Sequence, residues 1–62
     1  MTYVKFVDGK DNDITDVNTN IIPVVGNYVL FTSGKMARVT RVTNVYGRAG
    51  DWVEVTVEPV QS

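Results

Sequence analysis

Hydrophobic and polar residues alternate over much of this chain with the two-residue period of β-strands. The clearest example is the segment 52–58, in which three valines at alternate positions share one face and Glu54, Thr56 and Glu58 share the other. Pro59 then removes a backbone donor and ends the segment. The pattern predicts a half-buried strand near the end of the chain.

The first third of the chain has the pattern of a hairpin. Residues 2–7 are rich in β-branched and aromatic side chains and stop at Asp8-Gly9, a dipeptide suited to a tight turn. Residues 14–17 are a short candidate return strand, and the polar run Asn18-Thr19-Asn20 then breaks the chain. We expect two antiparallel strands joined by an acidic tip.

The middle of the chain predicts a lead-in segment and two further strands. Residues 21–26 are apolar but contain a proline and a glycine, so they are better suited to lead into a strand than to form one in a sheet centre. Strands are expected at 28–32 and 36–46, with a Ser33-Gly34 turn between them. Val39 and Val42 are three positions apart, and a β-bulge or a sharp bend near Arg41 would turn both toward the core.

Five or so short strands, with no helix of three turns, no repeat and no linker, predict an all-β fold in one domain over residues 1–62. A flat sheet would leave its edges unpaired and one apolar face uncovered. Curling into a small barrel of five to six strands solves both problems.

The run Pro23-Val24-Val25-Gly26-Asn27-Tyr28-Val29, followed by the Ser33-Gly34 turn, by Val39-x-x-Val42 and by a valine-rich final strand, resembles SH3-like small barrels. Many of those domains open a strand with Pro-x-x-Gly-Asp-x-Val, and this chain has Asn27 where the acidic residue is commonest. Together with residues 4–10, the segment also resembles short uncharacterised proteins encoded by bacteria and their phages. The resemblance implies a fold and carries no activity with it.

Composition narrows the chemistry. The chain has 62 residues and contains neither cysteine nor histidine, which excludes a disulfide framework, a thiol nucleophile, an imidazole base and the usual zinc ligands. Its small core leaves little room for a deep pocket. We expect a protein that is not an enzyme and that has no cofactor.

No run of about 20 apolar residues is present, and the first residues carry charge and aromatics where a signal peptide would be apolar. We therefore expect a cytoplasmic protein with no membrane segment. Four acidic residues near the first turn are the nearest thing to a metal site, but their spacing does not match a calcium-binding loop, and no metal site is expected: Asp8, Asp11, Asp13 and Asp16.

The net charge of -1 conceals an uneven distribution. The segment 17–50 contains no acid, and both segments around it are acidic. Small barrels that bind single-stranded nucleic acid combine basic grooves with aromatic platforms. The cations of the central segment therefore supply an alternative, nucleic-acid surface: Lys35, Arg38, Arg41 and Arg48. The sequence pI near 5.0 argues against this alternative.

Counting back along the final strand places Trp52 on the face of Glu54, away from the valines. Tryptophan, tyrosine and arginine are the residues most enriched at binding hot spots. We therefore expect a contact patch around the 47–51 loop: Arg41, Tyr46, Arg48 and Trp52. The competing interpretation is that the indole caps the barrel and has a structural role.

These observations predict a non-catalytic protein-binding module, an adaptor or an inhibitor of a larger protein, that is a monomer or a weak homo-oligomer. A nucleic-acid-binding barrel and a structural or assembly subunit are the alternatives.

Overall fold

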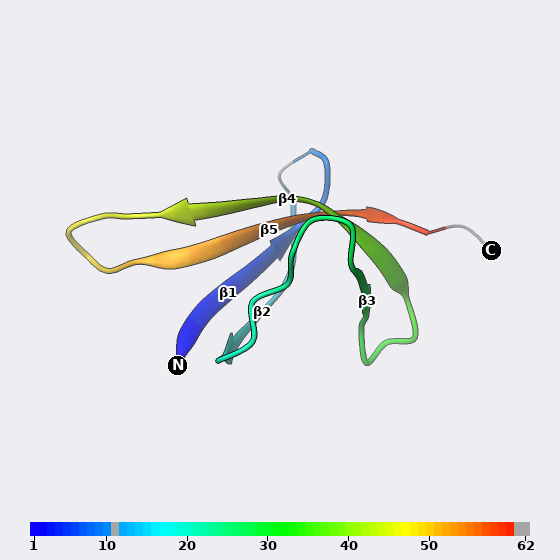
Figure 1. The fold of residues 1–62 in the computed structure, drawn as a ribbon, viewed down its shortest axis with the longest axis horizontal. Helices are drawn as coiled ribbons and strands as arrows, with labels where there is room; N and C mark the ends of the chain where they lie inside the picture. Colours follow the sequence, from blue (N-terminus) through cyan, green and yellow to red (C-terminus); the bar gives the residue numbers. More distant parts are fainter. Residues whose placement is uncertain (11, 61–62) are drawn as a thin grey trace.

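A computed structural model describes residues 1–10 and 12–60. Within them the chain forms a single five-stranded sheet with the spatial order β2-β1-β5-β4-β3 (Figure 1). The strands are β1 (Thr2–Val7), β2 (Asp13–Thr19), β3 (Tyr28–Leu30), β4 (Met36–Val45) and β5 (Trp52–Pro59). In the part of the chain so described, no helix is long and apolar enough to cross a membrane.

The predicted strands are all present, and their ends show where neighbouring strands override local sequence. β1 has the predicted bounds, and β4 and β5 each differ from the prediction by one residue. The predicted break at 18–20 is wrong for its first two residues, because Asn18 pairs with Tyr3 and Thr19 with Thr2. Pairing along the full length of β1 thus extends β2 through residues that favour turns in isolation.

The sheet is mixed. β1 lies parallel to β5, with Val4 beside Val53 and Phe6 beside Val55, and the other three pairings are antiparallel. The first and last strands of the described chain are therefore neighbours at the centre of the sheet. SH3 domains are usually all antiparallel, so this pairing departs from the expected arrangement.

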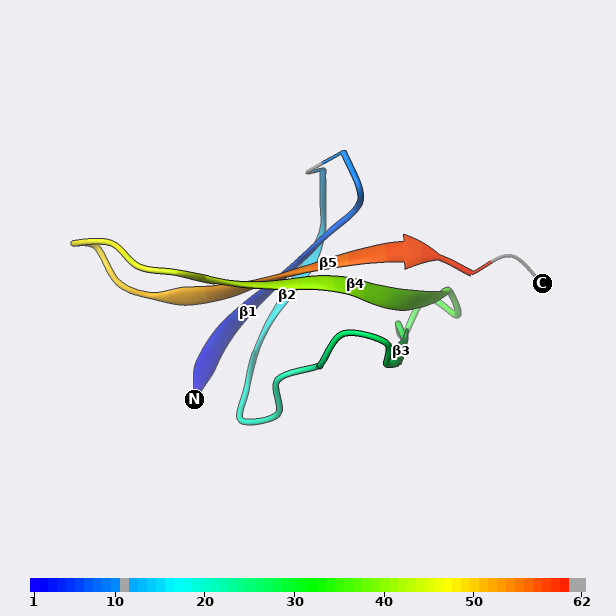
Figure 2. The ribbon, with the colours of Figure 1, turned by 45° about the horizontal axis from the view of Figure 1, so that its top comes forward.

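The sheet curls strongly but stays open, as the two views in Figures 1 and 2 show. β2 and β3 are its two edges, and no ladder joins them in the described residues. The prediction of a curled all-β sheet is confirmed, whereas the closed barrel is not observed. The fold is an open half-barrel.

The predicted bulge in β4 is confirmed. Val39 pairs with Val57 and Arg41 with Thr56, so Thr40 is the extra residue in the ladder. Its hydroxyl donates a hydrogen bond of 3.2 Å to the carbonyl oxygen of Thr56. Because the bulge adds one residue, Val39 and Val42 both face the core although they are three positions apart.

The core lies on the concave face of the curled sheet. It is built mainly from valines of β1, β4 and β5, with Phe6 packed edge-to-face against Phe31 at a centroid distance of 5.4 Å. Its fully or nearly fully buried members are Val4, Phe6, Ala37, Val39, Val53, Val55 and Val57.

The face of β5 turned away from the core is partly buried, although the sequence predicts that it is exposed to solvent. Thr56 is buried, although alternation places it with Glu54 and Glu58 on the face expected to be solvated. It lies between Val7 of β1, which is also buried, and Arg41 of β4. Within the described chain its hydroxyl has no hydrogen-bond partner. A central strand of a curled sheet is thus covered on both faces at this point.

Candidate functional site

The predicted contact residues gather at the end of the β4–β5 hairpin. This hairpin extends to one end of the long axis of the molecule, which measures 41 Å (Figure 1, left). The Gly50 N–H donates to the Gly47 carbonyl oxygen at 3.2 Å, which closes the turn. Gly50 has a φ of 135°, a backbone conformation that side-chain-bearing residues rarely adopt, so the turn requires glycine there.

Three of the four predicted contact residues lie at this tip, and we call them the hairpin-tip patch: Tyr46, Arg48 and Trp52. Tyr46 is 76% exposed and Arg48 is also exposed. Trp52 opens β5 directly opposite Val45, on the face turned away from the core, and is half-buried. The patch therefore combines one freely accessible aromatic ring with one that packs against the hairpin.

The indole of Trp52 has an unusual environment. Its Nε1 atom is covered and donates to no acceptor in the described residues. A covered donor without a partner is unfavourable, because the N–H has left water and gained no hydrogen bond in return. This atom is therefore a point at which the hairpin could gain stability from a substitution or from a contact.

Arg41, the fourth predicted contact residue, lies away from the tip. It pairs with Thr56, whereas Trp52 pairs with Val45, so four strand positions separate the two pairs. At about 3.3 Å per residue this is roughly 13 Å along the hairpin. Arg41 shares the face of Trp52, and a contact that includes both residues must run along the hairpin.

The cations of the nucleic-acid alternative are spread along the molecule. Lys35 precedes β4 and Arg48 follows it, so the length of a 10-residue strand separates them. Arg38 lies beside Glu58 in the ladder, and Arg41 follows on the same face after the bulge. The structure places these four residues in a line along β4 and does not gather them into one groove.

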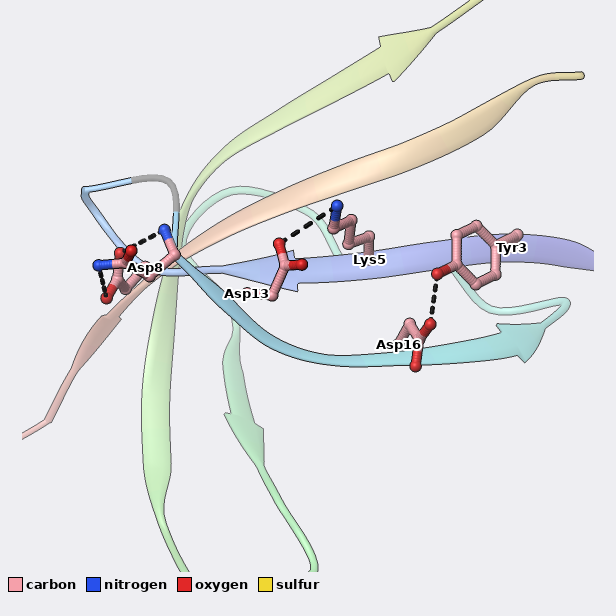
Figure 3. A network of polar contacts seen from close by, with 6 residues as sticks. Tyr3, Lys5, Asp8, Asp13 and Asp16 are labelled. Carbon is pink, nitrogen blue, oxygen red and sulfur yellow. Dashed lines mark hydrogen bonds and ion pairs between the residues drawn. The ribbon is translucent and has the colours of Figure 1, made fainter. Parts of the chain in front are cut away.

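The acidic first turn has a structural arrangement. Asp8, labelled in Figure 3, accepts hydrogen bonds from the backbone N–H groups of Asn12 and Lys10, at 3.0 and 2.8 Å. These bonds, led by the one from Asn12, hold the pKa of Asp8 below its ordinary value because they stabilise the carboxylate. Asp11, named above as a candidate ligand, lies outside the described residues.

The other two acids of this group pair across β1 and β2. Lys5 Nζ lies 3.2 Å from Asp13 Oδ1, and the Tyr3 hydroxyl donates to Asp16 (Figure 3). The bond to Asp16 raises the pKa of Tyr3, because loss of the phenol proton would break it and place two negative charges together. Among residues 1–10 and 12–60, no group of three or more acidic side chains converges to hold a metal ion.

An apolar groove between the two sheet edges was not predicted from the sequence. It has a volume of about 780 Å³. Ile14 and Val17 of β2 line one side, Leu30 and Met36 line the other, and Phe6 lies in the sheet between them. The four residues on the two sides are each more than 40% exposed. The groove's apolar side residues come from separate segments, Ile14 and Val17 from β2 and Leu30 and Met36 from the region around β3, so no single stretch of the sequence indicates it.

Comparison with protein families, with curated proteins and with solved structures gives no match for this chain. The geometry of the chain itself must therefore carry the functional argument. It offers two surfaces suited to macromolecular contact, the hairpin-tip patch and the groove between β2 and β3.

Proposed function

We propose that this chain is a non-catalytic protein-binding module that contacts its partner through the hairpin-tip patch. The observation that carries the proposal is the exposure of Tyr46, at 76%, on a projecting hairpin that also contains Arg48 and Trp52. An aromatic ring held away from the core by a closed turn contributes little to folding. The ring is thus available for a contact outside the chain.

The chemistry of the patch suits a protein surface. Tyr46 and Trp52 offer apolar area together with a polar atom, and Arg48 offers a planar donor for carboxylates. Such residues supply most of the binding energy in many protein interfaces. Arg41 extends the same face along β4 and would lie at the rim of a larger interface.

The expected role of the module is that of an adaptor or of an inhibitor that blocks a larger protein in the cytoplasm. The resemblance to short phage-encoded proteins supports this role, and the absence of cysteine and histidine supports the non-catalytic assignment. We also propose a relation to SH3-like barrels. The curled five-stranded sheet supports it, and the parallel β1–β5 pairing is a departure that it must accommodate.

The test is capture of a partner by the immobilised chain from a bacterial lysate, with and without nuclease, followed by mass spectrometry. The wild type is compared with Tyr46→Ala and Arg48→Glu. Lys35→Glu is the matched control, because it makes the same charge change at the other end of β4. We expect a protein that survives nuclease treatment, that is lost with both patch variants and that is retained by the control.

Other results would overturn the proposal. Retention that disappears with nuclease, and that all of the basic-residue variants weaken, would instead support the nucleic-acid alternative. Retention of the same protein by the patch variants would remove the hairpin tip as the contact surface.

Replacing Trp52 with alanine separates its structural role from its binding role. Because the ring is half-buried against Val45, we expect a loss of unfolding free energy of about 1–2 kcal/mol, smaller than for a fully buried aromatic residue. Thermal unfolding measures this loss. If the variant stays folded and loses the captured partner, Trp52 belongs to the interface; if it stays folded and keeps the partner, its role is structural.

A further inference from the structure

The two sides of the groove differ in charge: β2 is acidic, and β3 itself is uncharged but is followed by Lys35 in the turn to β4. β2 contains Asp13 and Asp16 and no basic residue. On the other side, Lys35 joins β3 to β4, and Arg38 follows on β4 beside β3. Asp16 and Lys35 both line the groove. One chain cannot bring its own β2 and β3 edges together while the half-barrel stays open.

The edges also have backbone groups available for pairing. Phe31 N–H donates to the Lys35 carbonyl oxygen, and Val39 N–H donates to the Asn27 carbonyl oxygen, so the residues on either side of β3 direct these backbone groups toward β4. By alternation, Tyr28 and Leu30 direct their N–H and C=O groups away from the sheet. Such an edge is a template for another strand.

The strand directions fit a second copy of the same chain. β3 runs in the direction of β1 and β5, and β2 runs in the opposite direction. If a second half-barrel is related to the first by a two-fold axis along the barrel, each β3 meets the other copy's β2 in the antiparallel sense. The two junctions are equivalent, as a two-fold dimer requires.

From these observations we propose that two copies of this chain associate edge to edge, the β2 of each on the β3 of the other, and enclose their two grooves in one interior. This inference uses a surface different from the hairpin-tip patch and goes beyond the proposed function. It pairs both open edges at once and places the acidic β2 of each copy beside the other copy's β3, which Lys35 follows.

The apolar side chains of the groove support a partner that covers them. Ile14, Val17, Leu30 and Met36 are 44%, 44%, 67% and 45% exposed, although they lie next to the core. A stable interface buries about 800 Å² on each partner, roughly one sixth of this chain's surface of 4744 Å². A chain with so small a core gains stability by sharing an interior with a second copy.

The charges favour this pairing over the pairing of like edges. Two β2 strands brought together in antiparallel sense would place the acids of one copy near those of the other, and Lys5 of β1, which pairs with Asp13, offsets only part of that charge. Two β3 edges would likewise bring both copies of Lys35 together, whereas Arg38 lies one strand further in, beside Glu58. Only the mixed junction places opposite charges across both seams.

The experiment is sedimentation velocity over a range of concentrations on the wild type, Lys35→Glu and Asp16→Lys. We expect a wild-type dimer, and we expect each substitution to raise its dissociation constant about tenfold, because each one changes both junctions. Mixing the two variants should restore association, since opposite charges then face each other at both junctions. Raised salt should weaken the wild-type dimer.

Arg48→Glu is the matched control, because it makes the same charge change as Lys35→Glu at the hairpin tip and should leave the dimer intact. Leu30→Glu is a second variant that tests the apolar seam without altering Asp16, which accepts the Tyr3 hydrogen bond. We expect it to weaken the dimer as well.

Three results would overturn the proposal. They are a wild type that stays monomeric at the highest concentration, a dimer indifferent to Lys35→Glu and Asp16→Lys, or a mixture of these two variants that associates no better than either alone. None of these results bears on capture of a partner by the hairpin tip, so the two proposals fail separately.

Discussion

The centre and the edges of this sheet are stabilised by different interactions. In β5, four of the five residues from 53 to 57 are buried, all but Glu54, and the strand has a neighbour on each side. In β2, six of seven residues are exposed, and its ladder is formed with β1. Hydrophobic burial therefore holds the centre, whereas hydrogen bonds and surface pairs hold the edge. The region that contributes least to stability is the one left available for contact.

The largest expected effect comes from the centre. Val55 is fully buried, and Val55→Ala should lower the free energy of unfolding by about 2–3 kcal/mol, because two methyl groups are lost and a cavity remains. Val17→Ala makes the same change in β2 at a position 44% exposed and should cost less than about 1 kcal/mol. Urea unfolding followed by Trp52 fluorescence measures both. Equal losses would show that β2 is as much a part of the core as β5.

A smaller effect, of opposite sign, is expected on the back of β5. Thr56→Val replaces a covered hydroxyl that has no partner among the described residues with a methyl group of similar size. We expect a gain of about 1 kcal/mol, because an unpaired buried polar group costs that much or more. Thr43→Val, on an exposed position of the same face, is the control and should change stability by less than about 0.5 kcal/mol. A loss of stability in Thr56→Val would mean that the hydroxyl makes a hydrogen bond that stabilises the folded state.

The smallest effect is the response of the β1–β2 edge to pH. The folded-state pKa of Tyr3 is raised above its ordinary value of 10.0, so its contribution to stability is complete below pH 10 and is lost as the pH rises further. The pKa of Asp8 is lowered from 3.8, so its contribution is present above that pH and is lost as the pH falls through the folded-state value. Melting temperatures of the wild type, Tyr3→Phe and Asp8→Ala against pH measure these contributions. A Tyr3→Phe profile with the same alkaline slope as the wild type would contradict the first assignment.

The strands and the bulge were predictable because local rules decide them. Alternation fixed the faces of β5, and the three-residue spacing of Val39 and Val42 has one simple solution in a strand, an extra residue between them. The position of Trp52 on the face away from the core follows from the same count.

The open seam and the burial of Thr56 were not predictable in this way. Whether β2 and β3 meet depends on the twist and curl summed over five strands, which no single segment contains. The alternation of side chains along β5 predicts that Thr56 shares a face with Glu54, but it does not predict which part of that face Val7 covers. The groove was missed for the same reason, since its sides come from strands at opposite edges of the sheet.

The parallel pairing of β1 with β5 also sets the order in which the molecule can form. Val4 lies beside Val53, so the central ladder joins residues 49 positions apart in the chain. Contacts of such long sequence separation slow folding, because a large loop must close before they form. On a ribosome, β1 must wait for nearly all of the described chain to emerge before it gains its central neighbour. A shortening at the β5 end would thus leave β1 paired with β2 alone, and the half-barrel exists only once β5 has been synthesised.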